Sequence, residues 1–358
     1  MKKKSLMLLP MAALCLGMLA SCEDENDNQK DQKEFTDPEG FGKGKIYIVG
    51  HKSPDTDAAA SAMVYADYLK QLGYDCEAYI AGPLNKETTF ILDTFQLTAP
   101  EILTNAAGKR VILVDHNEYL QAVDGASSAT ILRVVDNHPQ GTVTDALSYD
   151  TVRTAGSVCT ILYYRFTDKK MTISKKNAQL MLAGILSDTG RLKPAKSNDS
   201  DSIAVYNLLD IAGIVNLDAF YTRMHEFADN YDGMTDSEIF KSDYKAYEVK
   251  GIKYGIGNVD VTYSEELDLM EARMRTVMQE EMEAEGLDMM FCKLDADTID
   301  CSRILYCGNN AEAKAEEAFL NMGIEDVTSE KVGKYIMVYP HISRKKIMVP
   351  QLETILSK

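Results

Sequence analysis

The sequence predicts an α/β protein of two domains, a larger one built on a doubly wound parallel sheet and a smaller second one. Short apolar runs alternate with longer amphipathic stretches from Lys45 onward, which is the rhythm of βαβ units. The composition changes near residues 229–233, and more strand-like runs follow. The chain has 358 residues, of which 45% are hydrophobic, so it can build two separate cores.

The N-terminal segment reads as a lipoprotein signal peptide, residues 1–21. Three lysines precede an apolar run from Leu6 to Leu19, which is too short to span a bilayer comfortably. The run ends in Leu-Ala-Ser-Cys, which resembles a bacterial lipobox and predicts lipidation of Cys22. The acidic residues that follow resemble the surface-export signal of Bacteroidetes lipoproteins. We therefore expect a lipid-anchored protein of the cell envelope, either periplasmic or on the outer-membrane surface, with a flexible acidic tether over residues 22–44.

The first domain is expected over residues 45–232. Strand-like runs cover 46–50, 77–82, 111–115 and 131–136, and residues 58–72 between the first two repeat apolar side chains at helical spacing and stop at Gly73. Such units form a parallel sheet, which binds ligands at the carboxyl ends of its strands. Two further helices are expected over 174–186 and 202–212.

The second domain is expected over residues 233–358, after a hinge near 229–236. Strand-like segments cover 254–260, 289–295, 303–308 and 335–340, and residues 264–286 predict a long helix between the first two. This region is of ordinary domain size.

The charge of the chain limits its partners. A formal net charge of −17 should repel nucleic acid and anionic membrane surfaces, so any anionic substrate needs a locally basic site. Five cysteines remain once Cys15 leaves with the signal and Cys22 carries lipid. No cysteine–histidine cluster indicates zinc, and we expect these cysteines to be small buried hydrophobes, with room for one disulfide.

Candidate metal ligands follow the first strand directly. The loop after residues 46–50 contains His51, Asp55 and Asp57 just before a helix. Carboxylate oxygens suit hard divalent cations, and an imidazole shifts the preference toward Mn²⁺ or Co²⁺. Acidic residues also favour the positive end of a helix dipole, so this loop alone leaves the metal and the capping interpretations equally open.

Three more segments carry the same chemistry. Asp115 and His116 follow the strand at 111–115, residues Asp136-Asn137-His138 follow the strand at 131–136, and Asp188 follows a helix. Capping explains one such aspartate but not four segments together. The pattern predicts a binuclear metal site at the carboxyl edge of the sheet.

From Lys45 to Leu352 the chain resembles the DHH phosphoesterase superfamily, and within it the manganese-dependent family II inorganic pyrophosphatases. The resemblance implies a site in the cleft between an N-terminal DHH domain and a DHHA2-like substrate-binding domain that closes over it. The segments that carry it, in matching order and spacing, are GHKSPDTD (50–57), AGPLNKET (81–88), VDHNE (114–118), VVDNH (134–138), GSVCTIL (156–162), LSDT (186–189), DYK (243–245) and SRKK (343–346).

The resemblance also implies roles for individual residues. One metal would be bound by His51, Asp55 and Asp115. The other would be bound by Asp57, the shared Asp115, Asn137 and Asp188. Substrate would be bound by His116, Lys193, Lys245, Arg344 and Lys345. The residues expected to act in catalysis are His138, Lys245, Arg344 and Lys345.

The activity that follows from the resemblance is the hydrolysis of inorganic pyrophosphate to two phosphates by a hydroxide held between two divalent cations. Mn²⁺ or Co²⁺ is expected in the site, with Mg²⁺ as an alternative that would also accompany the substrate. No enzyme nucleophile is needed. A homodimer is a further expectation.

Two features keep alternatives open. The middle position of the Asp-His-His motif that names the superfamily is Asn137, whose neutral amide oxygen should weaken transition-metal binding and favour Mg²⁺. The segment after LSDT is also altered around Lys193. An exported pyrophosphatase is unusual for this family, so we also consider an exopolyphosphatase acting on short polyphosphate, or another hydrolase of the DHH superfamily acting on a nucleotide-derived phosphoester. A lipoprotein that binds phosphate or metal with reduced catalysis is the remaining alternative.

Overall fold

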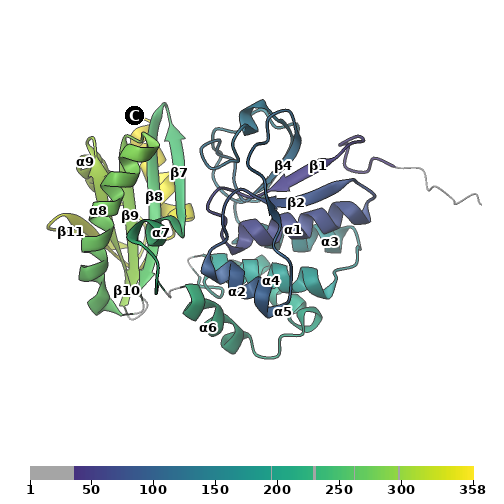
Figure 1. The fold of residues 1–358 in the computed structure, drawn as a ribbon. Coiled ribbons are helices and arrows are strands. Elements are labelled where there is room, and N and C mark those ends of the chain that lie inside the picture. Colours follow the sequence, from purple (N-terminus) through teal and green to yellow (C-terminus); the bar gives the residue numbers. More distant parts are fainter. Residues whose placement is uncertain (1–35, 195, 229–230, 262, 297–298) are drawn as a thin grey trace, which may run out of the picture. The chain divides into compact units, whose positions relative to one another are not determined.

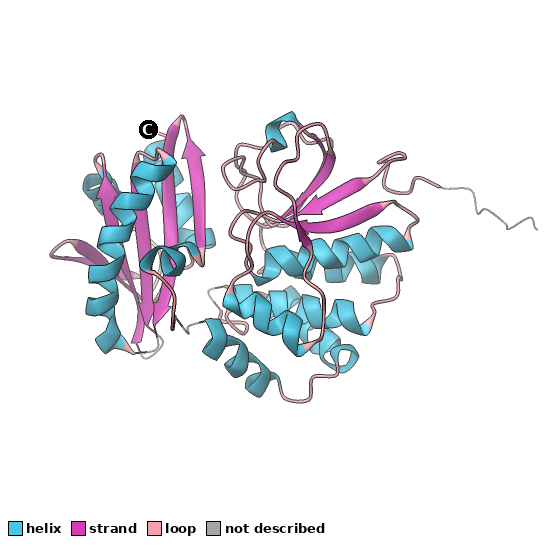
Figure 2. Cartoon of the chain, viewed as in Figure 1, coloured by secondary structure: helices cyan, strands magenta, loops and turns pink. Residues whose placement is uncertain are grey.

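The computed structural model describes residues 36–358 except 195, 229–230, 262 and 297–298. Its first sheet is entirely parallel, with the strand order β3-β2-β1-β4-β5-β6 (Figures 1 and 2). This order confirms a doubly wound sheet, because the chain moves outward from β1 in one direction and returns to start again at β4 on its other side. The strands are β1 (Ile46–Val49), β2 (Cys76–Ile80), β3 (Glu101–Ile102), β4 (Arg110–Val114), β5 (Thr130–Asp136) and β6 (Tyr149–Thr151).

Helices cover one face of this sheet in two layers. Helix α1 packs on the strands and is itself covered by α3 and α4, and Figure 1 shows it between the sheet and the outer helices. The alanines of α1 allow this close packing, since a Cβ on Gly50 would lie 2.9 Å from the Cβ of Ala58. The helices are α1 (Thr56–Gln71), α2 (Lys86–Thr94), α3 (Val158–Asp168), α4 (Lys175–Thr189), α5 (Asp199–Ala212) and α6 (Leu217–Ala228).

The opposite face is covered by loops, turns and the short 3₁₀ helix η1 (Ala126–Ser128). The apolar side chains of β1, β4 and β5 pack there against Leu103, Ala106, Ala122, Val123, Ala126 and Val143. The second half of the sheet therefore keeps the doubly wound strand order without full crossover helices.

The second sheet is mixed, with the order β11-β12-β10-β9-β8-β7, and only the β8–β9 pair is parallel. Helices α7 and α8 pack on one face, and α9 and α10 on the other. The elements are α7 (Asp236–Lys241), β7 (Tyr244–Val249), β8 (Ile252–Val261), η2 (Ser264–Glu266), α8 (Leu267–Glu285), β9 (Met289–Ala296), β10 (Ile299–Gly308), α9 (Ala311–Phe319), β11 (Thr328–Val332), β12 (Tyr335–Tyr339), the π-helical turn η3 (Arg344–Met348) and α10 (Val349–Leu356).

The expected elements are all present, with ends shifted by a few residues. The helix expected over 264–286 is η2 followed by α8, and the helix expected over 174–186 continues as α4 to Thr189, so Asp188 lies inside it. Helix α3 was not foreseen, because its first residues are apolar on every side and lack a helical pattern. Edge strand β7, which contains Lys245, was also missed.

The start of the described chain differs from expectation. The predicted signal peptide and the Cys22 lipidation site lie outside the described residues. Residues 37–44, which we expected to belong to the flexible tether, pack onto the first domain instead. Phe41 is buried, and Glu39 forms ion pairs with Arg133 and Arg165. A buried carboxylate between two guanidinium groups ties this segment down.

The five cysteines of the described region are free, and all but Cys307 are buried, as expected for small apolar side chains. No single helix among residues 36–358, gaps excepted, has the length and hydropathy of a membrane span. The bent pair Asp199–Ala212 and Leu217–Phe227, with 96° between its helices, meets those criteria only when the two are taken together.

Asp201 joins the start of α5 to the start of α3. Its buried carboxylate accepts hydrogen bonds from Gly156 N (2.9 and 3.0 Å), Thr160 Oγ1 (2.7 Å) and Asn198 N (2.8 Å). We expect Asp201→Ala to lower the free energy of unfolding by about 3 kcal/mol, because three donors lose a charged acceptor. The control Asp199→Ala removes an exposed carboxylate from the first turn of the same helix and should cost about 0.5 kcal/mol. Urea unfolding measures both, and equal losses would contradict this role.

Candidate metal centre and substrate cleft

The loop after β1 presents His51 and Asp55 side by side. His51 Nδ1 lies 3.0 Å from the Lys52 carbonyl, which turns Nε2 toward Asp55 Oδ2 at 3.2 Å and Asp115 Oδ2 at 3.4 Å. Asp55 caps α1 with one oxygen, accepting from Ala58 N at 2.9 Å, and faces His51 with the other. The capping and metal-binding interpretations of this loop are therefore compatible, because each uses a different carboxylate oxygen.

Asp115 is the centre of the arrangement. It follows β4, which lies next to β1, so both loops leave the sheet where the strand order reverses. Its backbone has a φ of 60°, which is uncommon outside glycine and typical of residues held in place at functional sites. Its side chain is fully buried, yet neither oxygen has a hydrogen-bond partner among the described residues. A buried carboxylate in this state needs a cation.

Asp57 and Asp188 complete a second group around Asp115. Asp57 accepts from the first turn of α3, namely from Ser157 Oγ (2.6 Å), Val158 N (2.6 Å) and Cys159 N (3.0 Å). Burial and the Asp115 charge nevertheless raise the pKa of Asp57 to about 6. Asp188 lies in the last turn of α4, where the helix dipole disfavours negative charge. Burial raises the pKa of Asp188 well above its usual range, against the lowering effect of Lys345.

Asn137 turns its amide oxygen toward this group. The Asn137 Nδ2 donates to the Ala155 carbonyl at 3.0 Å, which leaves Oδ1 to accept from Lys345 Nζ at 2.9 Å. The amide oxygen is therefore oriented as a ligand atom would be.

Asp136 holds the segment that contains Asn137 and His138 through hydrogen bonds. Its Oδ1 accepts from Asn137 N (2.8 Å) and lies 2.8 Å from His138 Nδ1, and its Oδ2 accepts from Asn117. His138 Nδ1 also lies 3.6 Å from Asp115 Oδ1. The His138 side chain lines the cleft. Asp136 was not assigned a role from the sequence, although its place at the end of β5 was the available signal.

Three sets of side chains have ligand atoms within 4.8 Å of one another: His51, Asp55 and Asp115; Asp57, Asp115 and Asp188; and Asp115, Asp136 and His138. Asp115 belongs to all three. Buried carboxylates that share one space repel each other, and neither Asp115 oxygen has a hydrogen-bond partner among the described residues that would offset this repulsion. Oxygen donors with an imidazole suit divalent cations such as Mn²⁺. The residues present thus fit two divalent cations, and Asp115 is the side chain that the candidate groups share.

Two lysines of the second domain reach these carboxylates. Lys245 Nζ lies 3.4 Å from Asp55 Oδ2 and 4.0 Å from Asp115 Oδ2. Lys345 Nζ lies 2.8 Å from Asp188 Oδ2 and 3.9 Å from Asp115 Oδ1. Burial lowers the pKa of both ammonium groups, but the surrounding aspartates outweigh it and raise each above its ordinary value. Both lysines are therefore charged at neutral pH.

The other expected substrate residues lie in different positions. Arg344 lines the cleft but contacts Asp243, through Oδ1 at 2.5 Å and the backbone carbonyl at 2.8 Å. Lys193 is exposed and also lines the cleft. His116 does not line it. Its Nδ1 lies 2.8 Å from the Val114 carbonyl, and its ring packs edge-on against His51. This position favours a supporting role for the His116 ring over direct contact with substrate.

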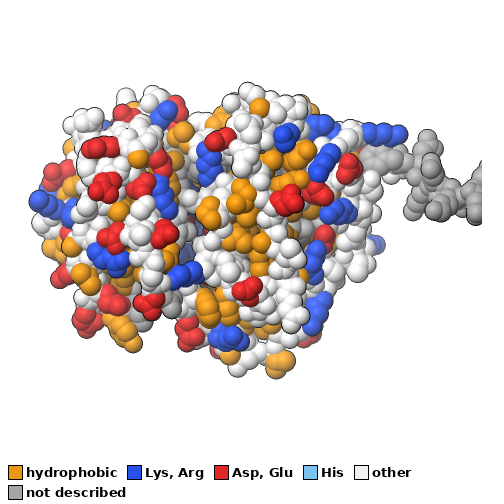
Figure 3. Space-filling view, in the orientation of Figure 1, with side chains coloured by type: hydrophobic (Ala, Val, Ile, Leu, Met, Phe, Trp, Pro, Cys, Tyr) orange, Lys and Arg blue, Asp and Glu red, His pale blue; other side chains and the backbone are white. Residues whose placement is uncertain are grey.

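The site opens into a cleft of about 940 Å³ lined by both domains. Nine lysines and arginines and eight aspartates and glutamates line it, whereas the whole chain has 38 and 55. On the face shown in Figure 3, acidic and basic side chains are interspersed. The cleft is thus richer in positive charge than the protein as a whole, as an anionic substrate requires.

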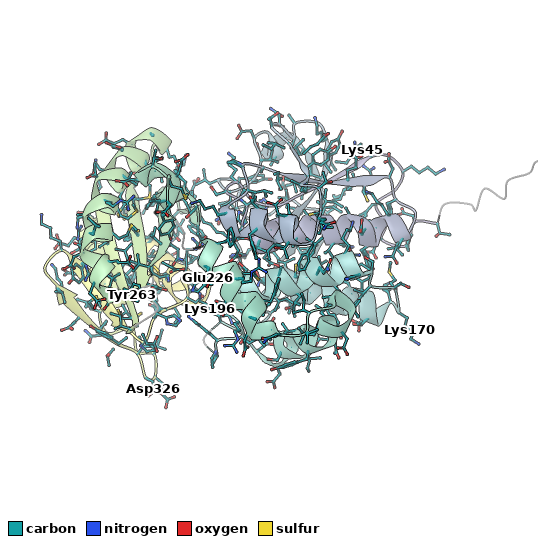
Figure 4. All side chains as sticks on the ribbon, turned by 60° about the horizontal axis from the view of Figure 1, so that its bottom comes forward. Lys45, Lys170, Lys196, Glu226, Tyr263 and Asp326 are labelled. Carbon is teal, nitrogen blue, oxygen red and sulfur yellow. The ribbon has the colours of Figure 1, made fainter. Side chains whose placement is uncertain are left out.

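A second polar group lines the cleft and was not foreseen. Asn258 and Asp260 project from β8 beside Lys293 and Asp295 of β9, and Lys196 comes from the loop after α4 (Figure 4). The signal was present in the sequence. A polar residue alternates with an apolar one at the ends of the strand-like segments 254–260 and 289–295, which places both polar positions of each strand on one face.

Comparisons with known proteins agree with this geometry. Residues 45–185 match the model of the DHH family N-terminal domain, and residues 222–355 match the DHHA2 domain. A manganese-dependent inorganic pyrophosphatase of Methanothrix thermoacetophila is 34% identical over 315 residues, which are 87% of this chain and 99% of that protein. Its counterpart from Methanocaldococcus jannaschii is 32% identical, covering 86% and 98%.

A solved structure described as a family II inorganic pyrophosphatase of Methanococcus jannaschii superposes with a TM-score of 0.77 at 31% identity. The match covers 87% of this chain and 100% of that one. The sequence and the fold therefore agree over both domains: the chain belongs to the family of manganese-dependent, family II inorganic pyrophosphatases.

Proposed function

We propose that this protein hydrolyses inorganic pyrophosphate to two phosphates with two divalent cations as cofactors. The observation that carries the proposal is the buried Asp115 carboxylate, which shares three candidate metal groups while two lysines face it from the other side of the cleft. Family membership supports the same activity.

The two sides of the cleft would divide the work. His51, Asp55, Asp57, Asp115, Asn137 and Asp188 would hold the cations, which supply charge neutralisation and lower the pKa of a bound water. Lys245 and Lys345 would bind the phosphate oxygens and balance the charge that builds up as the phosphates separate. Arg344 can offer two parallel donors to a phosphate, although it must share them with Asp243. His138, held by Asp136, would contact the substrate phosphate from the cleft wall.

Asn137 influences which metal is used. An amide oxygen is a harder and weaker donor to Mn²⁺ or Co²⁺ than an imidazole. Mg²⁺ should therefore compete more effectively here than at a site with histidine in this position. The remaining ligands, five side chains with an imidazole among them, still favour Mn²⁺ or Co²⁺.

The size of the cleft favours short polyphosphate as a second candidate substrate. Its volume is at the upper end of the range of about 300–1,000 Å³ that small-molecule sites span, although pyrophosphate is a small ligand. The cleft is also lined by three lysines that have no role in the pyrophosphate mechanism above, namely Lys196, Lys293 and Lys346. Lys196 is labelled in Figure 4. Asp260 and Asp295 lie among them and weaken the case, so pyrophosphate remains the first choice.

The location of the protein is a separate proposal, based on the N-terminal sequence alone. The charged and apolar segments before Cys22 support a lipoprotein of the cell envelope, and the acidic residues after it support exposure on the membrane surface. The substrate would then be extracellular or periplasmic. The homodimer stays a prediction.

Phosphate release from a substrate panel tests the activity. We expect pyrophosphate to be cleaved faster than tripolyphosphate, longer polyphosphate or a dinucleotide, with Mn²⁺, Co²⁺ or Mg²⁺ present. Asp115→Asn should lose most binding of both cations by calorimetry and reduce hydrolysis by several orders of magnitude with an unchanged circular dichroism spectrum. A wild-type protein that is inert with every metal would favour the binding-only alternative, and near-normal turnover in Asp115→Asn would remove the bridging assignment.

Asn137→His tests the second metal position. An imidazole in place of the amide oxygen should tighten Mn²⁺ or Co²⁺ binding about 10–100-fold, a size typical of changes in the surroundings of a metal. We expect kcat to stay similar or fall, because a more electron-rich set of ligands makes the cation a weaker Lewis acid. Calorimetric titration of both proteins measures the affinity. Equal affinities would mean that residue 137 is not a ligand.

Cys22→Ser tests the anchor. The thiol is the atom that would carry lipid, so this variant should move from the membrane fraction to the soluble fraction of fractionated cells. Cys15→Ser is the matched control, because it alters a cysteine of the signal segment and should leave the protein with the membranes. The lipobox interpretation is wrong if the unmodified protein is itself soluble.

A further inference from the structure

Gln121 lies between β4 and η1 and makes hydrogen bonds toward both halves of the site. Its side-chain Nε2 donates to the backbone carbonyl of Ala246 in β7 at 2.8 Å. Its own carbonyl accepts from Lys52 N at 2.7 Å. The residue is 5% exposed, so both hydrogen bonds are shielded from water and a lost partner would leave a buried polar group unpaired.

The acceptor belongs to the strand that carries Lys245. Strand β7 lies at the edge of the second sheet and pairs only with β8, and an edge strand leaves carbonyls free to accept from other groups. Ala246 directly follows Lys245, whose ammonium lies 3.4 Å from Asp55. The Gln121 side chain therefore fixes the peptide next to the lysine that faces the metal ligands.

The other hydrogen bond of Gln121 reaches the first metal loop. Lys52, whose N–H donates to the Gln121 carbonyl, also contacts His51 through its own carbonyl, which lies 3.0 Å from His51 Nδ1. One residue thus connects the backbone behind His51 with the backbone behind Lys245.

The residue before Gln121 adds an apolar contact at the same place. Leu120 packs against the core cluster of α7, α8 and strands β7 to β10, which belongs to the second domain. Residues 120 and 121 therefore attach the segment that follows Asp115 to the strand that carries Lys245. The attachment consists of one apolar contact and one buried hydrogen bond.

We infer that Gln121 is a positioning residue for Lys245: its hydrogen bond to Ala246 holds β7 so that the ammonium faces the substrate phosphate. The inference rests on the proposed function only in taking Lys245 as a phosphate ligand. Gln121 itself neither lines the cleft nor belongs to a candidate metal group. Loss of the side-chain amide should therefore weaken phosphate binding and leave metal binding unchanged.

The experiment compares Gln121→Met with Gln179→Met. Methionine keeps the length of the side chain and removes the donor. Gln179 is the matched control, because its Nε2 donates to the Ala212 carbonyl at 3.2 Å within the first domain, and it does not line the cleft. Calorimetry measures the binding of imidodiphosphate, a non-hydrolysable pyrophosphate analogue, to Mn²⁺-loaded protein, and of Mn²⁺ alone. Pyrophosphate hydrolysis gives KM and kcat in parallel.

We expect Gln121→Met to bind the analogue about 10-fold more weakly and to raise KM with little change in kcat, while Mn²⁺ affinity stays as in wild type. Gln179→Met should match wild type in its affinity for the analogue, its kinetic constants and its affinity for Mn²⁺. In a Lys245→Met background, Gln121→Met should weaken binding of the analogue by less than about a further 2-fold, because the effects of two residues that act through one contact are not additive.

Wild-type-like analogue binding by Gln121→Met, an equal loss in Gln179→Met, or full additivity with Lys245→Met would each overturn the inference. Weaker Mn²⁺ binding in Gln121→Met would also overturn it, since the defect would then lie in the metal loop. A wild type that binds the analogue but cleaves no pyrophosphate would reject the proposed function, while the binding comparison would still decide the role of Gln121. A wild type that does not bind the analogue would overturn both.

Discussion

The crowding of carboxylates around Asp115 is the constraint on which the rest of the site depends. Asp55, Asp57 and Asp188 surround a fully buried side chain whose two oxygens have no hydrogen-bond partner in the described part of the chain, and the ammonium groups of Lys245 and Lys345 lie 3.9–4.0 Å from them. Unpaired charge in a protein interior is costly, so this arrangement can persist only if the scaffold holds the carboxylates and cations neutralise them. The hydrogen bonds of Asp57 to α3 and of Asp55 to α1 provide the first condition, and the lysines of the second domain, together with bound cations, provide the second.

The sheet topology explains how distant segments come to share this space. Strands β1 and β4 are neighbours, and the chain leaves them in opposite directions, so their carboxyl ends open a crevice that no crossover fills. Asp115 adopts a positive φ to turn its side chain into that crevice. Asp188 reaches it from the end of α4, which packs on α1. On one face, the second half of the sheet is covered by loops, turns and the short 3₁₀ helix η1 rather than by long helices, and the turn between β4 and η1 contains Gln121.

The sequence allowed prediction of the parts that depend on local pattern. The parallel strands that end beside Asp115 and at Asp136 could be placed from the short apolar runs, and the candidate metal ligands were chosen from where those runs end. Contacts between residues that are far apart in the sequence could not be predicted, because no local sequence pattern indicates them. Nothing near Asp57 indicates that it caps α3, a hundred residues away, and Lys245 lies on an edge strand too polar to stand out. The position of His116 behind His51 was equally invisible, because the sequence shows which residues follow a strand but not which of them turn inward.

The two domains contribute charges of opposite sign to the cleft, and this division affects how they approach each other. The first domain contributes almost all the buried negative charge, and the second contributes Lys245, Arg344 and Lys345. Arg344 pairs with Asp243 of its own domain, whereas Lys245 and Lys345 pair with aspartates of the first domain, so electrostatic attraction favours approach of the two domains. A substrate that carries negative charge into the cleft would loosen these lysine–aspartate pairs. Attraction alone does not fix the position of β7 relative to the first domain, because a point charge such as an ammonium group accepts many geometries. A directional hydrogen bond such as that from Gln121 to Ala246 does fix this position. A neutral amide beside the site can therefore control how the ammonium group of Lys245 meets the substrate.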